Sequence, residues 1–326
     1  MYFLTEEESR WLLKHLIPRA REEGVASELR GWNWHDSPLE PPYEIRLTVS
    51  EVAGKYCPSG RDLFLKRVER VESQPSVAML TGTACHSAVA QLIEQAKRLI
   101  YLKGPEDLDG IATGLREFRP QITLPENLAE NQAALVRERV QKICDFEVPR
   151  IIGRISETLA KQPYSGCDSL VAQAIPVVCE QKLDGRFLGL SPLLSCDSAF
   201  FGGAVIYDVK FGQKRDFHRL GVTAYGMVME SLWEFPVDVG CIVYVDLRGS
   251  VPVITRDLFL IDDELRQWFI DERDDKMRML YEGQDPGVAE ECPEYCGYYA
   301  VCRGRTRMQL DTGFDTGCSD RRNCLV

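Results

Sequence analysis

The chain has 326 residues, of which 44% are hydrophobic, and a formal net charge of −11. This length allows one large domain with additions or two domains, each with a sizeable core. The acidic balance argues against a general nucleic-acid coat but leaves room for a local basic groove. No apolar run approaches the roughly 18 residues of a membrane span.

The N-terminus and the cysteine content indicate a cytoplasmic protein. Thr5-Glu6-Glu7-Glu8 is acidic where a signal peptide would be basic, and it has the pattern of a capping box that opens a helix. Twelve cysteines are many for a cytoplasmic chain. Because disulfides are rare in that compartment, metal binding is the better interpretation of any clustered set.

Helix start signals and apolar residues at helical spacing predict a mostly helical first half. The predicted segments are an N-terminal extension over residues 1–48, a short helix from Thr48 that closes at Cys57-Pro58, a long helix over 79–101 and a helical insertion over about 105–165. His86 lies near the beginning of the long helix.

The pattern then changes to the alternating and continuous apolar runs that are typical of strands. Predicted strands cover residues 174–183, 193–201, 204–211, 241–245 and 251–260, and predicted helices cover 217–233 and 262–282. Gly202-Gly203 is expected to form the hairpin turn between the second and third strands. This order predicts an α/β domain at residues 49–260, followed by a C-terminal helix and cysteine-rich segment at 261–326.

An acidic site is expected on one face of the sheet. Side chains alternate faces along a strand, so Asp208 and Lys210 point to the same side. In a hairpin that turns at residues 202–203, Asp197 falls opposite Asp208. Two carboxylates and a lysine can bind a divalent cation, orient an attacking water and stabilise the charge of a pentacovalent transition state, which is the chemistry of phosphodiester hydrolysis. A surface Asp–Lys pair on an edge strand is the alternative.

Two further residues are candidates for this site. His86 can be a third metal ligand if its helix packs over the sheet beside Asp197; the alternative is a core or capping histidine. Tyr225 can reach a phosphate or a catalytic water through its hydroxyl, or it can be a core residue of its helix. Residues near the site that could form a basic, aromatic groove for a single strand are Lys214, Arg215 and Phe217.

Three late cysteines have the spacing C-x3-C-x5-C, namely Cys292, Cys296 and Cys302. Three thiolates so close in sequence can hold one metal centre with a fourth ligand from elsewhere. Cys57 is the best candidate, because it too is followed by proline and lies in a predicted turn. Zinc sites more usually have two C-x2-C pairs, so the three-plus-one arrangement favours an iron–sulfur cluster, with zinc as the alternative. Cys318 and Cys324 are competing ligands.

These motifs, taken in order, resemble those of the RecB-like nucleases of the PD-(D/E)XK superfamily. The motifs are Gly82-x3-His86, Asp197, Asp208-x-Lys210 and Tyr225, bracketed by one early and three late cysteines. The cysteine arrangement resembles that of the iron–sulfur exonucleases of CRISPR adaptation modules and also that of helicase-linked repair nucleases. The stretch from Leu29 to Trp34 resembles the longer variant found with archaeal type I-A systems.

The resemblance implies a fold and a set of ligands. The fold is a restriction-endonuclease-like core, a mixed sheet flanked by helices, with a C-terminal iron–sulfur subdomain that Cys57 completes. His86, Asp197, Asp208 and the carbonyl of Val209 would bind manganese or magnesium, with Lys210 and Tyr225 as further catalytic groups. The ligands of a [4Fe–4S] cluster would be Cys57, Cys292, Cys296 and Cys302.

The resemblance also implies a function, namely a metal-dependent DNA exonuclease that trims single-stranded ends or overhangs of CRISPR prespacers. Its partners would be DNA, the CRISPR integrase and the small partner subunit of that integrase. Two alternatives are a DNA-end binding module with little cleavage of its own and a helicase-associated repair nuclease. The chain departs from the family pattern at Gly221, where a glutamine is usual, and in its C-x3-C spacing, where C-x2-C is more usual.

Overall fold

The computed structural model describes residues 1–304 except 74, 201–204 and 293–295, and describes residues 198–200 by their backbone alone. The predicted turn at Gly202-Gly203 and the competing ligands Cys318 and Cys324 lie outside the described residues. None of the helices in the described part of the chain is long and apolar enough to cross a membrane.

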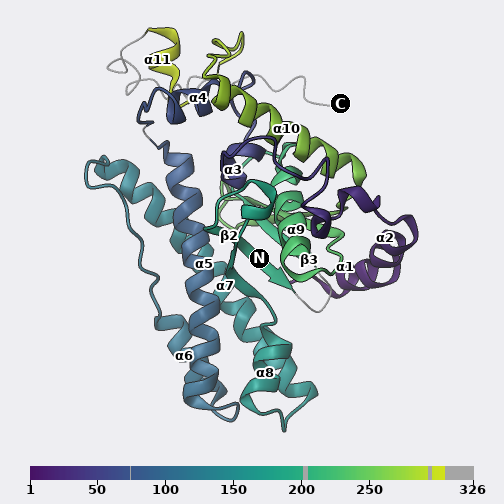
Figure 1. The fold of residues 1–326 in the computed structure, drawn as a ribbon. Coiled ribbons are helices and arrows are strands. Elements are labelled where there is room, and N and C mark those ends of the chain that lie inside the picture. The colour runs from purple at the N-terminus through teal and green to yellow at the C-terminus, as the bar shows by residue number, and fades with distance from the viewer. Residues whose placement is uncertain (74, 201–204, 293–295, 305–326) are drawn as a thin grey trace, which may run out of the picture.

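A five-stranded mixed sheet forms the centre of the molecule (Figure 1). The strands are β1 (Val178–Leu183), β2 (Leu194–Phe200), β3 (Val205–Lys210), β4 (Val239–Asp246) and β5 (Val253–Leu260), in the spatial order β1-β2-β3-β4-β5. Strands β3 and β4 are parallel and are joined by helix α9 (His218–Trp233), whereas the other neighbours are antiparallel. The predicted α/β class and the mixed sheet are therefore confirmed.

The hairpin register predicted for β2 and β3 is confirmed over three residue pairs. Ser198 pairs with Tyr207 and Phe200 pairs with Val205. The pairing with β3 reaches Ser198 and does not include Asp197, the residue that precedes it. The side chain of Asp197 instead accepts a hydrogen bond from the backbone N–H of Val209 at 2.9 Å. Asp197 is thus joined to β3 through its carboxylate.

Helices cover both faces of the sheet, which gives two hydrophobic cores. One face, with Tyr207 and Val209, packs on α5 (Val77–Lys103), α6 (Leu108–Glu117), α7 (Glu130–Lys161) and α8 (Cys167–Ala174). The other face, with Ile206 and Ile242, packs on α9, α3 (Val49–Ala53) and α10 (Asp263–Glu282). Figure 1 shows α5 and α7 side by side in the first group, and α4 (Arg61–Arg67) near α11 (Tyr299–Arg303) at the C-terminal end of the described chain.

The N-terminal extension begins as the sequence predicts. Thr5 and Glu8 form the predicted capping box, with the Glu8 N–H bonded to Thr5 Oγ1 at 3.1 Å. The helical residues that follow are α1 (Glu6–Trp11), a π-helical turn (Leu12–Leu16) and α2 (Ile17–Glu23), then two 3-10 turns at Ser27–Leu29 and Gly31–Asn33. The division of the chain at residues 48 and 260 stays a prediction.

Two predicted boundaries are wrong. The capping box at Thr48 does start α3, but the helix ends at Ala53 because Gly54 takes an extended backbone, so Cys57-Pro58 lies in a separate loop. The strand predicted to start at residue 174 starts at Val178, because Cys167–Ala174 forms α8. In the second case a run of apolar residues fits either a helix or a strand, and the tertiary packing decides between them.

Candidate active site

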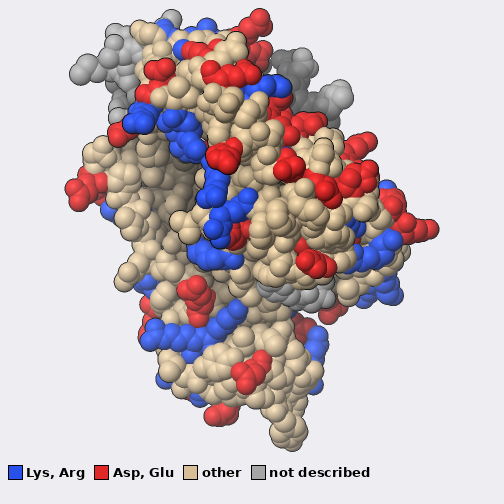
Figure 2. Space-filling view, in the orientation of Figure 1, with Lys and Arg blue, Asp and Glu red and all other residues tan. Residues whose placement is uncertain are grey.

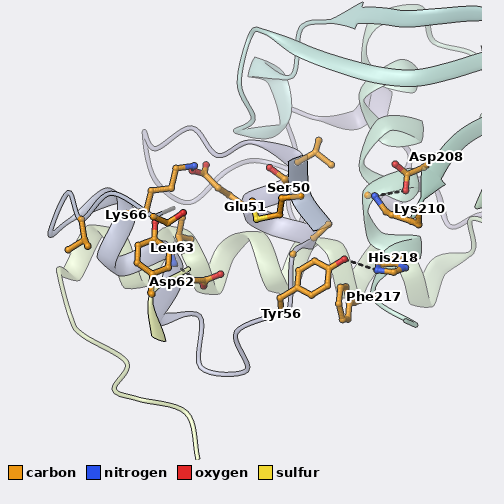
Figure 3. A pocket seen from close by; sticks show the side chains of 18 of the residues that line it. Ser50, Glu51, Tyr56, Asp62, Leu63, Lys66, Asp208, Lys210, Phe217 and His218 are labelled. Carbon is orange, nitrogen blue, oxygen red and sulfur yellow. Dashed lines mark hydrogen bonds and ion pairs between the residues drawn. The ribbon is translucent and has the colours of Figure 1, made fainter. Parts of the chain in front are cut away.

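The predicted pair of an acid and a lysine, Asp208 and Lys210, lies at the carboxyl end of β3. Asp208 and Lys210 share one face of the strand, and Nζ of Lys210 is 2.7 Å from Oδ2 of Asp208. Both side chains line a cavity of about 790 Å³ (Figure 3). Burial alone would lower the pKa of Lys210, but the Asp208 carboxylate outweighs burial and raises this pKa above its usual value. Lys210 is therefore a protonated, positively charged group at the cavity wall.

Asp197 and His86 form a second pair beside the first. Nδ1 of His86 is 3.2 Å from Oδ2 of Asp197, so helix α5 packs over the sheet where the metal-ligand hypothesis requires it. Burial raises the pKa of Asp197; the charge of His86 opposes this shift and that of Asp208 adds to it. The four side chains thus act on one another electrostatically, although they come from β2, β3 and α5.

The donor types in this group suit a hard divalent cation. Carboxylate oxygens are ligands of magnesium and manganese, and an imidazole nitrogen favours manganese over magnesium. In the described residues, however, no three His, Cys, Asp or Glu side chains converge closely enough to hold an ion. The Asp208 carboxylate instead contacts Lys210, and the Asp197 carboxylate contacts His86 and the backbone N–H of Val209.

Helix α9 contributes one wall of the same cavity through His218, Gly221 and Tyr225. Burial raises the pKa of Tyr225, so its hydroxyl stays protonated at neutral pH. At Gly221 an added Cβ would meet Val49 and Ala53 at 3.8 and 3.9 Å, which is ordinary contact. The cavity therefore has room for a side chain at the position where the related family has a glutamine.

A hydrogen-bonded chain at the cavity was not predicted from the sequence. The Tyr56 hydroxyl is 2.9 Å from Nε2 of His218, and Nδ1 of His218 is 3.2 Å from the Tyr244 hydroxyl. Burial, helped by the charge of Lys210, lowers the pKa of His218 to about 4, so the ring is neutral at neutral pH. The three residues lie on a loop, a helix and a strand, and no spacing pattern in the sequence links them.

Basic residues at the cavity come from an unexpected element. Lys66 on α4 and Arg70 just after it line the cavity. Of the residues predicted to form the groove, Phe217 lines the cavity, whereas Lys214 pairs with Asp257 at 3.3 Å. Figure 2 shows Lys and Arg side chains in a band beside a hollow that starts near α4, and acidic side chains over α10.

The early cysteine, Cys57, lies in the same region of the structure as the late cysteines. The thiols of Cys57 and Cys292 act electrostatically on Cys296, whose pKa is raised, mainly by burial. Arg61, four residues after Cys57, places Nη1 3.6 Å from Sγ of Cys302. None of the ten cysteines that the structure describes is in a disulfide. In the described residues no three of these thiols converge closely enough to hold one metal centre, so the three-plus-one ligand set stays a prediction.

Comparisons with known proteins show the family of the chain. The family model of the CRISPR-associated exonuclease Csa1 matches residues 1–306. The protein of that name from Thermoproteus tenax is 30% identical over 279 residues, which cover 86% of this chain and 92% of the relative. The one from Saccharolobus solfataricus is 29% identical over 303 residues, 92% of this chain and 99% of the relative. The chain is thus a nuclease of a CRISPR-associated class. It belongs to the family of the CRISPR-associated exonuclease Csa1.

Proposed function

We propose that the protein is a metal-dependent DNA exonuclease that trims single-stranded ends or overhangs of CRISPR prespacers before their integration. The observation that carries this proposal is the Asp208–Lys210 pair in the wall of the cavity, next to the Asp197–His86 pair. The names of both relatives support exonuclease activity and a CRISPR role.

The proposed chemistry assigns a role to each side chain. His86, Asp197, Asp208 and the Val209 carbonyl would hold manganese or magnesium, which when bound polarises the phosphate and lowers the pKa of a water. Lys210 is protonated in the ion pair with Asp208, so it would donate to the negative charge that develops on the phosphate and would not be a general base. The Tyr225 hydroxyl would donate a hydrogen bond to a phosphate oxygen in the cavity.

We infer a separate role for the cysteines. Cys57, Cys292, Cys296 and Cys302 would hold a [4Fe–4S] cluster that ties the C-terminal segment to the loop before α4. The contact of Cys302 with Arg61, four residues after Cys57, and the interaction of Cys296 with Cys292 and Cys57 support this assignment. Zinc is the alternative, and visible absorption separates the two because a zinc site is colourless.

The test is a cleavage assay with end-labelled single-stranded and overhang DNA in manganese. We expect cleavage by the wild type and by Lys161→Ala, a control that removes an exposed lysine of α7 far along the chain from the site. We expect cleavage to be lost in Lys210→Ala while its thermal unfolding is unchanged. Equal cleavage by Lys210→Ala and wild type would reject the site.

The second candidate function is a DNA-end binding module of an integrase complex. Gly221 favours it, because the cavity lacks the substrate-side amide that the related family has at this position. DNA binding without turnover in manganese would support this function. Co-purification with the integrase and its small partner subunit fits either function, whereas co-purification with a helicase would indicate a repair nuclease.

A further inference from the structure

An aromatic side chain that no motif includes stands at the mouth of the catalytic cavity. Tyr56 lines this cavity, yet 56% of its side-chain surface is exposed. Its ring lies edge-to-face with Phe217, with ring centres 5.0 Å apart and planes at 86°. Figure 3 shows Tyr56 at the same end of the cavity as Lys210 and Asp208.

The Tyr56 ring is fixed from the sheet side. Its hydroxyl is bonded to the buried, neutral His218, which is bonded in turn to Tyr244. Tyr244 is the partner of Lys210 in the parallel register of β3 and β4. The ring is thus held through hydrogen bonds to the strand beside the catalytic lysine.

The loop of Tyr56 is also held on its other side. Lys55 forms an ion pair with Glu272 of α10, and Ser59 Oγ donates to the Gly287 carbonyl at 2.9 Å. Holding a half-exposed aromatic side chain in one position costs conformational entropy. Such pre-organisation is typical of a binding residue whose remaining surface meets a ligand.

We propose that Tyr56 is the stacking platform for the unpaired nucleobase next to the phosphodiester that is cleaved. The proposal rests on the proposed nuclease function and names the substrate group that this cavity recognises. Arg70 lines the cavity and would meet a neighbouring phosphate, whereas Lys66, also in the lining, is already in an ion pair with Glu51 at 2.8 Å. A base inside a duplex has both faces covered by its stacked neighbours, whereas an unpaired nucleotide exposes its faces and can stack on the platform. Tyr56 thereby favours single-stranded ends.

The test measures binding by fluorescence anisotropy in EDTA, where cleavage is blocked. The probes are a short single-stranded oligonucleotide and a series in which one abasic nucleotide is moved stepwise from the end. The variants are Tyr56→Ala, Tyr56→Phe, which keeps the ring but loses the bond to His218, and Tyr164→Ala. Tyr164 is fully exposed and outside the cavity, so it is the matched control.

We expect Tyr56→Ala to bind the intact strand about ten-fold more weakly, whereas Tyr56→Phe and Tyr164→Ala stay within about three-fold of wild type. One abasic position should weaken wild-type binding by a similar factor, and Tyr56→Ala should lose nothing further there. Wild-type binding that is equal at every abasic position would overturn the platform, and this result does not depend on the folding of any variant.

The outcomes also separate this proposal from the nuclease function. If the wild type cleaves DNA but its binding is the same at every abasic position, the exonuclease function stands and the platform proposal is rejected. If an abasic position weakens binding by the wild type but the wild type does not cleave, the platform proposal stands and the exonuclease function is rejected. An abasic penalty that is the same in Tyr56→Ala as in wild type assigns the contact to another residue and contradicts the proposal.

Discussion

Nδ1 of His86 lies 3.2 Å from Oδ2 of Asp197, so a residue of helix α5 and a residue of strand β2 meet at the end of the sheet. The helical first half of the chain thereby supplies part of the candidate active site. The contact also means that any cation held by Asp197 has an imidazole within reach. The contribution of His86 to metal binding can be measured through the manganese dependence of cleavage.

Replacing His86 with alanine should raise the manganese requirement of cleavage. Loss of a residue that contacts a metal ligand, as His86 contacts Asp197, typically lowers metal affinity by about 10–100-fold. We therefore expect the manganese concentration for half-maximal cleavage to rise by about that factor, with partial recovery at high manganese. A manganese titration of wild type and His86→Ala tests this. An unchanged manganese dependence would show that His86 is a structural partner of Asp197 only.

Adding a side chain at Gly221 should increase activity. The site has space, and glutamine has a better helix propensity than glycine, so Gly221→Gln should fold at least as stably as wild type. One added hydrogen bond to the substrate corresponds to about 0.5–1.5 kcal/mol, or roughly two- to ten-fold in the cleavage rate. Single-turnover rates on single-stranded and overhang DNA measure this gain. A stable variant with the wild-type rate and strand preference would indicate that position 221 does not contact the substrate.

The N-terminal extension is docked on α9 at Gly31. The Gly31 N–H donates to Glu230 Oε2 at 2.9 Å, and an added Cβ would collide with the Met227 carbonyl oxygen and lie 2.8 Å from Glu230 Cβ. Gly31→Ala should therefore lower the free energy of unfolding by about 1–3 kcal/mol. Gly153→Ala is the control, because it lies inside α7 with nothing near its Cβ and should be neutral or stabilising. Urea unfolding measures the free energy of unfolding of wild type, Gly31→Ala and Gly153→Ala. A Gly31→Ala variant as stable as the wild type would contradict the docking of the extension on α9.

The buried Glu230 carboxylate should make stability depend on pH. Burial alone would raise the pKa of Glu230, but the Arg266 guanidinium outweighs burial and lowers this pKa from its usual 4.5. Because the folded-state pKa is lowered, the contribution of Glu230 to stability is complete above about pH 4.5 and is lost as the pH falls through the folded-state pKa. Glu230→Gln should cost about 3–5 kcal/mol at neutral pH, because it leaves Arg266 and Arg30 without this buried carboxylate.

Unfolding curves of wild type and Glu230→Gln at a series of acidic pH values test this assignment. The difference in stability between the two proteins should shrink as the pH falls. A difference that stays constant over the acidic range would place the titrating group elsewhere.

The proposed iron–sulfur cluster predicts that the protein is coloured and that loss of one cysteine ligand removes the colour. Cys296→Ala should abolish the visible absorption of the purified protein and make its C-terminal segment more sensitive to protease. Cys167→Ala is the matched control, since this partly exposed thiol of α8 donates to the Ile100 carbonyl of α5 and is not one of the four predicted ligands. A colourless wild type that contains zinc would reject the iron–sulfur cluster.

The sequence predicts those parts of the site that depend on local geometry. Strand alternation places Asp208 and Lys210 on one face, and the position of the predicted turn at residues 202–203 gives the hairpin register. The contact of His86 with Asp197 follows only if α5 crosses this part of the sheet, a condition that the structure fulfils.

Other features could not be predicted because they depend on packing between distant segments. The contact between Tyr56 and His218 joins a loop to a helix that share no sequence pattern. Lys66 and Arg70 reach the cavity because α4 packs at its mouth, and the sequence has no strong start signal for that helix. The start of β1 at Val178 is likewise set by the packing of α8.

The most direct test of the central claim is single-turnover cleavage of a duplex with a single-stranded overhang, with wild type and Lys210→Met in manganese. Methionine retains most of the side-chain length but removes the charge and the ion pair with Asp208. We predict that wild type removes the overhang, and that Lys210→Met binds the same DNA equally well but cleaves at least about 100-fold more slowly. Cleavage at the same rate by both proteins would contradict the assignment of the active site to Asp208 and Lys210.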